Sequence, residues 1–163
     1  MILYSIGHSN VSIEAFVKLL IERQMEILVD VRSQPYSRYN PHFSRESLKM
    51  SLEENKIRYV FLGDSIGGKP QATGFRLENG GVDYDKLAES ELFQKGLQQL
   101  IDTGTGARVS FMCAEADFKH CHRYWLITRA LLKRGIEVKH ILHSHALADT
   151  NADDFNVIQP SLF

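Results

Sequence analysis

The sequence has few cysteines, almost no net charge and no long apolar run, and each shortage excludes a class of protein. Two cysteines in 163 residues cannot form the disulfide framework of a small secreted domain. Nineteen basic against twenty acidic residues give no bulk attraction to nucleic acid or acidic membranes. No run approaches the ~20 apolar residues of a membrane helix, and the first residues lack the basic region of a signal peptide. We therefore expect a cytoplasmic protein without membrane attachment.

The remaining composition indicates one globular domain. Hydrophobic residues make up 44% of the chain, which is too much for a disordered protein. The length is sufficient to bury a core without disulfides or metal. We expect an α/β domain over residues 1–142 and a polar C-terminal tail over residues 143–163.

Apolar runs of strand length alternate with stretches of helical periodicity. We expect strands near residues 2–6, 27–31, 57–62, 108–112 and 137–142. Between them we expect helices at residues 12–24, from 44 onward, at 85–102 and from 117 to just before 135. This alternation favours a single-domain, mostly parallel, doubly wound (Rossmann-like) sheet of about five strands with helices on both faces.

Reactive and charged residues follow the expected strands directly. The carboxyl ends of parallel strands share one rim, where ligands of such sheets bind. The candidate catalytic residues at this rim are His8, Asp30, Cys113 and Glu115. The candidate substrate-binding residues are Arg32, Arg38, Arg123, Gly67, Gly68 and Lys69. Loops collect polar residues in any protein, which is the plain alternative to a functional rim.

Several strings of residues carry a family resemblance. They are residues 5–9, residues 29–33 with Pro35, Ser37, Arg38, Asn40, Pro41 and Phe43, the turn at residues 67–70, and residues 112–117 followed by 121–123. Over about residues 2–142 the chain resembles the domain of unknown function 488 family, and the last string is the most specific. The resemblance implies an α/β fold and a shared polar site, without an established reaction.

Cys113 has three interpretations. At a strand end before a helix it could be a nucleophile, because backbone N–H groups there lower a thiol pKa. This arrangement resembles rhodanese-like sulfurtransferases and related phosphatases, although Glu115 and Asp117 replace their Gly- and Arg-bearing anion cradle. Cys121 and His122 are its thiol partners in this reading. A metal site formed by Cys113, Cys121 and His122 is disfavoured. Adjacent residues of a helix, such as Cys121 and His122, point about 100° apart, and the spacing of the three residues is not a usual zinc pattern. The third interpretation is a small buried residue.

The charged rim residues have two interpretations each. Glu115 and Asp30 could form a carboxylate pair for acid–base work, with His8 assisting near neutral pH. Arg32 and Arg123, like Arg38, could hold phosphate or carboxylate groups. Alternatively, the arginines neutralise the carboxylates in a structural ion-pair network.

Other motifs carry less information. Residues 67–69 form a weak phosphate-loop pattern within a long polar segment, and we interpret them as a mobile lid with one cation. Tyr36 and Tyr39 could stack on bases or shield their own loop. We expect three histidines to be exposed, because nothing nearby completes a metal site: His140, His143 and His145.

The last residues suggest a partner. Gln159, Leu162 and Phe163 resemble the short peptide by which many bacterial DNA repair and replication proteins dock on the sliding clamp. Pro160 departs from the commoner leucine of that peptide, and a tail folded onto its own domain is the alternative.

We therefore weigh three functions. The leading one is an enzyme, a hydrolase or a transferase with a cysteine and carboxylates, that acts on a nucleotide or nucleic-acid-like anion in DNA maintenance. The second is a rhodanese-like thiol enzyme that uses Cys113 for sulfur transfer or for redox exchange with Cys121. The third is a non-catalytic binding module. The sequence predicts no cofactor and no bound metal.

Overall fold

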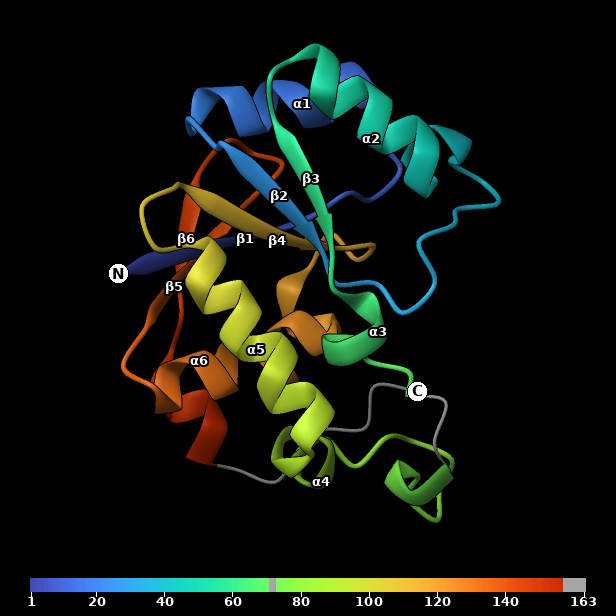
Figure 1. Ribbon diagram of the computed structural model, residues 1–163, viewed down its shortest axis with the longest axis vertical. Helices are drawn as coiled ribbons and strands as arrows, with labels where there is room; N and C mark the ends of the chain where they lie inside the picture. The colour runs from blue at the N-terminus through green and yellow to red at the C-terminus, as the bar shows by residue number, and fades with distance from the viewer. Residues whose placement is uncertain (71–72, 157–163) are drawn as a thin grey trace.

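A single mixed sheet organises the chain. The computed structural model describes residues 1–70 and 73–156. Its strands are β1 (Ile2–Gly7), β2 (Ile27–Asp30), β3 (Arg58–Phe61), β4 (Val109–Cys113), β5 (Glu137–Ile141) and β6 (Leu147–Asp149). Their order across the sheet is β3-β2-β4-β1-β5-β6 (Figure 1). All neighbours are parallel except β5 and β6.

Helices cover both faces of the sheet. On one face lie α1 (Ile13–Glu22) and α2 (Arg45–Glu54), which form one apolar cluster with inward residues of β1 and β2. The other face holds α3 (Gly63–Ile66), α4 (Tyr84–Glu89), α5 (Glu91–Thr103) and α6 (Arg129–Lys133). Figure 1 shows the two layers on opposite sides of the sheet. Burial of both faces explains why β2 and β4 are apolar along nearly their whole length.

The α/β fold predicted from the sequence is confirmed, with one additional strand. The five expected strands lie within one or two residues of their predicted positions. The sixth, β6, lies in the segment expected to be a tail and pairs antiparallel with β5 through Ile141 and Leu147. Beyond it, the 3-10 helix η5 (Ala152–Asn156) packs Phe155 against Tyr124 and Trp125. Residues 143–156 therefore extend the sheet and its aromatic packing.

The prediction of a single helix between residues 117 and 135 is wrong. Asp117 caps only a short 3-10 helix, η3 (Phe118–His120), by accepting a hydrogen bond from the Lys119 N–H. Cys121 then has extended backbone, with φ −144° and ψ 152°. A π-helix, η4 (Arg123–Thr128), follows and continues into α6. Cys121 therefore sits in a break between helices, so its side chain need not follow helical geometry.

Additional short elements complete the chain. Two more 3-10 helices, η1 (Pro41–Phe43) and η2 (Thr73–Phe75), lie in the loops after β2 and after α3. None of the described helices has the length and apolarity required to cross a bilayer.

Candidate functional site

The carboxyl ends of three neighbouring strands meet at one rim of the sheet. Gly7 of β1 is level with Cys113 of β4, and Asp30 of β2 is level with Met112. Gly7 permits this convergence, because a Cβ there would lie 1.7 Å from the Glu115 carbonyl oxygen. A cavity of about 310 Å³ opens above the rim. It is lined by His8, Arg32, Ser33, Gln34, Tyr36, Ser37, Gly68, Lys69, Tyr84, Cys113, Ala114, Glu115, His120, Cys121 and His122.

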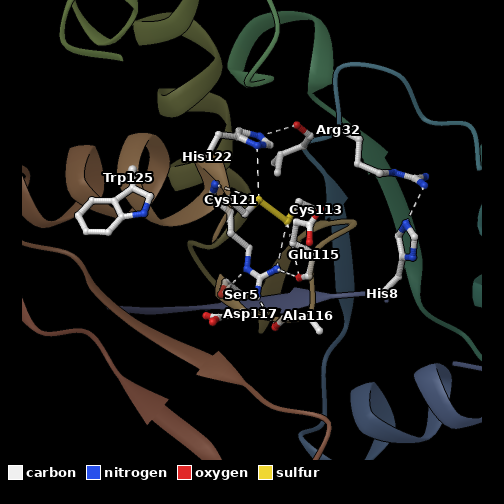
Figure 2. The surroundings of a disulfide bond; sticks show 12 residues. Ser5, His8, Arg32, Cys113, Glu115, Ala116, Asp117, Cys121, His122 and Trp125 are labelled. Atoms are coloured by element: carbon white, nitrogen blue, oxygen red, sulfur yellow. Dashed lines mark hydrogen bonds between the residues drawn. A yellow bond between two sulfur atoms is a disulfide. The ribbon is translucent and has the colours of Figure 1, made fainter. Parts of the chain in front are cut away.

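Both cysteines of the chain lie in the wall of this cavity and are bonded to each other. Figure 2 shows the disulfide between Cys113, at the end of β4, and Cys121, in the extended break after η3. Their exposed fractions are 2% and 6%. The pair therefore has contact with the cavity but little with bulk solvent.

A fully buried arginine lies beside this disulfide. Arg123 Nη1 is 3.1 Å from Cys113 Sγ and donates to the Glu115 carbonyl oxygen at 2.7 Å. Its Nη2 donates to the Ala116 carbonyl oxygen at 3.3 Å, and its Nε to Ser5 Oγ at 3.2 Å. Burial lowers the pKa of Arg123 to about 9, an effect that the charges of nearby carboxylates oppose. At neutral pH this is a buried cation held by neutral acceptors.

A buried hydrogen-bond chain orients Arg123 from behind. Thr150 Oγ1 donates to the Val138 carbonyl oxygen, so it accepts from His140 Nε2 at 2.9 Å. His140 Nδ1 then carries no hydrogen and accepts from Ser5 Oγ at 2.5 Å. His140 is fully buried, so the expectation that it would be exposed is wrong. The apolar stacking against Phe118 and the two hydroxyl partners explain its burial.

His122 holds the other side of the cysteine pair. Its Nε2 lies 2.9 Å from the Val31 carbonyl oxygen, which can only accept, so Nε2 carries the hydrogen. Nδ1 therefore presents a lone pair to Cys121 Sγ at 3.5 Å. Burial lowers the pKa of His122 to about 4, which keeps the ring neutral at pH 7. Gly68 packs on this ring, where a Cβ would lie 2.6 Å from Cγ of His122.

Asp30 and Arg32 form a closed ion pair at the end of β2. Asp30 Oδ1 accepts from Arg32 Nε at 2.9 Å, and Oδ2 accepts from Arg32 Nη2 at 2.8 Å. Oδ2 also accepts from Tyr59 Oη at 2.6 Å. The exposed fractions are 0% for Asp30 and 6% for Arg32. Both oxygens of the Asp30 carboxylate are therefore hydrogen-bonded. This agrees with the alternative in which the arginines neutralise the carboxylates in a structural ion-pair network.

His8 lies next to this ion pair. Its Nδ1 donates to the Ser9 carbonyl oxygen at 2.7 Å, so Nε2 accepts from Arg32 Nη1 at 3.4 Å. The ring stacks on Phe43 with centroids 4.4 Å apart. Burial is the largest of the effects that lower the pKa of His8 to about 4. The imidazole is therefore neutral at pH 7 and serves as an acceptor.

The structure brings most predicted site residues together and separates a few. Glu115 and Lys69 are exposed side chains at the cavity. Four predicted site residues are not among the described residues that line it: Asp30, Arg38, Gly67 and Arg123. Gly67 packs closely on Ser33, whose Oγ accepts from the Lys69 N–H at 2.9 Å. The clamp-peptide residues Gln159, Leu162 and Phe163 lie outside the described residues.

The sequence pattern does not identify several residues of the site. Ser5 and Tyr59 are partners of the ionised groups of Arg123 and Asp30, and Ser33 accepts from the Lys69 backbone N–H, but nothing in their residue types marks these roles. His143 is half-buried and not exposed as expected, because its Nε2 lies 2.6 Å from the Gly7 carbonyl oxygen. His145 is exposed, as predicted, and contacts Glu22.

The buried histidines make stability depend on pH. The pKa values of His8 and His122 are lowered to about 4 and that of His140 to about 3, mainly by burial. The unfolded chain takes up these protons near pH 6.5, so the free energy of unfolding falls as the pH drops from about 6.5 toward 4. Each histidine contributes a slope of up to about 1.4 kcal/mol per pH unit.

Urea unfolding at pH 7, 6 and 5 measures this slope. His140→Gln removes one titrating ring, so we expect a shallower slope than in the parent chain. A free energy of unfolding that is constant over this range would contradict the buried, neutral state of these rings.

Within the described residues, no group of three or more histidine, cysteine and acidic side chains is placed to hold a metal ion.

A family model described as "Domain of unknown function DUF488" matches residues 12–130. Searches of curated proteins and of solved structures found no match.

Proposed function

This chain belongs to the family described as domain of unknown function DUF488, and we propose that it is a thiol–disulfide exchange enzyme. One observation carries the proposal: the Cys113–Cys121 disulfide lies in a cavity wall between Arg123 and His122. Catalytic or redox-sensing roles are the usual ones for a disulfide in a cytosolic protein. We propose the cytoplasm as its compartment, where such a disulfide would cycle between its oxidised and reduced forms.

Cys113 is the nucleophile in this proposal. In the reduced site its thiolate would receive the Nη1–H of Arg123, a buried cation that has no carboxylate partner in the ion pairs of the described residues. A cationic neighbour favours the thiolate, which is the attacking form of cysteine. The neutral acceptors around Arg123 leave its charge available to the sulfur.

Cys121 is the resolving thiol. The lone pair on His122 Nδ1 can accept the Cys121 S–H, and the backbone N–H of Arg123 lies 3.4 Å from the same sulfur. The first contact orients the Cys121 S–H, and the second stabilises the negative charge that develops on this sulfur when it attacks. The roles follow from the different neighbours of the two sulfurs.

The reaction balances as a two-electron exchange. The Cys113 thiolate attacks a substrate disulfide R–S–S–R, forms a mixed disulfide and releases one R–S⁻. Cys121 attacks Cys113 Sγ and forms the intramolecular disulfide, while its proton passes to the second R–S⁻, which is released as R–SH. The substrate is reduced to two thiols, and two equivalents of an external thiol reverse the steps to regenerate the dithiol.

Acid–base chemistry on a nucleotide-like substrate has less support from the geometry. Asp30 uses both oxygens on Arg32 and Tyr59, so Glu115 has no second free carboxylate beside it among the described residues that line the cavity. Docking on a sliding clamp remains a prediction about residues 159–163.

Single cysteine variants test the proposal. With reduced protein and a small disulfide, Cys121→Ser should accumulate a mixed disulfide on Cys113, because the resolving thiol is absent. Cys113→Ser should form adducts at least tenfold more slowly, because Arg123 no longer has a thiolate to stabilise. Intact-mass spectrometry after acid quenching measures both.

The parent chain and an unfolded control complete this experiment. The parent should show a transient adduct and then the intramolecular disulfide. If both cysteine variants react at the rate of urea-unfolded protein, the folded site does not activate either thiol and the proposal fails.

A further inference from the structure

The burial of the two sulfurs limits which substrates can reach them. Cys113 and Cys121 expose 2% and 6% of their surface, and only through a cavity of about 310 Å³. Small-molecule sites begin at about this size. Because so little of either sulfur is exposed, a small free disulfide that enters the cavity suits Cys113 Sγ better than a disulfide held on the surface of a folded protein.

One side of the cavity presents a cation. Lys69 is exposed, and the ion pairs formed within residues 1–70 and 73–156 do not involve its ammonium group. Its backbone N–H is fixed on Ser33 Oγ, and the preceding Gly68 packs on the His122 ring. The charge of Lys69 is one of the effects that lower the pKa of His122, as expected for neighbours. Lys69 therefore belongs to the Cys121 side of the site.

The Cys113 side presents an anion. The Glu115 carbonyl oxygen is held by Arg123 at 2.7 Å, which anchors this residue two positions after Cys113. The Glu115 side chain is exposed and takes part in no ion pair of the described chain. Asp117 differs, because its carboxylate accepts from the Lys119 N–H and lies 3.8 Å from His120 Nε2. Glu115 is thus the acid that is available to a ligand.

We propose that the substrate is the disulfide of a small amino-acid thiol, of which cystine is the simplest. An α-amino acid carries a carboxylate and an ammonium group a few bonds from its sulfur. The carboxylate would pair with Lys69 and the ammonium group with Glu115, while the sulfur meets Cys113. This inference rests on the proposed exchange reaction and adds the substrate class and two binding residues.

Four small disulfides that differ in charge test this inference. They are cystine, with both charges, cystamine, with ammonium groups alone, 3,3′-dithiodipropionate, with carboxylates alone, and uncharged bis(2-hydroxyethyl) disulfide. Each rate of oxidation of the reduced protein is divided by the rate of the same disulfide with dithiothreitol. This ratio removes differences in leaving-group reactivity.

We expect cystine to have the highest ratio, at least tenfold above the uncharged disulfide. Lys69→Gln should lower the ratio about fivefold for cystine and dithiodipropionate, because a fivefold change corresponds to the free energy of one exposed ion pair. The ratio for cystamine should stay unchanged. Glu115→Gln should lower the ratio for cystine and cystamine and leave the ratio for dithiodipropionate unchanged. Lys95→Gln, on the exposed face of α5, is the matched control and should change none of them.

The outcomes separate this inference from the proposed function. Rapid exchange with all four disulfides at equal ratios, unchanged in both variants, would overturn the amino-acid specificity and leave the exchange function standing. No reaction faster than that of unfolded protein with any disulfide would overturn both. Loss of the cystine preference in 1 M salt would agree with recognition by exposed charges.

Discussion

Arg123→Met is expected to slow the attack of Cys113 on small disulfides by about 10- to 100-fold at pH 7. The Arg123 guanidinium lies 3.1 Å from Cys113 Sγ and has only neutral acceptors otherwise. A hydrogen bond from a charged donor contributes about 1.5–3 kcal/mol. Loss of that amount should shift the pH midpoint of Cys113 alkylation upward by about one to two units.

The measurement is the rate of iodoacetamide labelling of reduced protein between pH 5 and 10. Arg123→Lys is the second variant, because it keeps a charge but loses the forked contacts, and it should give an intermediate midpoint. Circular dichroism verifies folding of both. An unchanged midpoint in folded Arg123→Met would contradict a stabilising role of this cation.

Asp30→Asn is expected to destabilise the fold by about 3–5 kcal/mol. The substitution removes the charge that compensates Arg32, which is only 6% exposed, and leaves that cation buried without a partner. It also disturbs the short contact from Tyr59 Oη, whose pKa is raised by burial and by the Asp30 charge. Urea unfolding at pH 7 measures the change in the free energy of unfolding.

Lys95→Gln is a suitable comparison for this second variant. Lys95 and Glu91 form an ion pair on the surface of α5, with side chains 72% and 84% exposed, so its loss should change stability by less than about 1 kcal/mol. If Asp30→Asn lowers the free energy of unfolding no more than Lys95→Gln does, the buried Asp30–Arg32 pair does not stabilise the fold as we expect.

The sheet was predictable because burial on both faces leaves a clear pattern in the sequence. The apolar run at β2 and the amphipathic period of α1 mark these elements, and Ser12 caps α1 by accepting the Ala15 N–H at 3.1 Å, as its position before the first apolar residue predicts. β6 was not predictable, because three residues carry too little pattern to mark a strand.

The rim residues were predictable as a set, but their pairing was not. The rule that parallel strands share one rim brings Cys113 and Glu115 to a common cavity with His8. The extended backbone of Cys121 interrupts the helix that we expect between residues 117 and 135. Its contact with Cys113 was therefore one of the interpretations that the sequence left open, and spacing alone could not select it.

The burial of His140 shows the same limit. His140 lies within the expected strand at residues 137–142, but its type does not predict burial, because the two partners that make burial tolerable, Ser5 and Thr150, lie on β1 and after β6. Buried polar networks depend on contacts between distant segments, so single-sequence patterns miss them.

The most direct test of the exchange function is a redox titration of the Cys113–Cys121 pair in the chain of residues 1–163. Protein equilibrated across dithiol–disulfide buffers is quenched with acid, alkylated and weighed by mass spectrometry. We predict one reversible two-electron transition between the doubly alkylated and the unalkylated, disulfide-bonded chain, and a more negative midpoint in Arg123→Met because the reduced thiolate loses its cation. If the two cysteines alkylate independently, with no intramolecular disulfide under any buffer, the exchange function is contradicted.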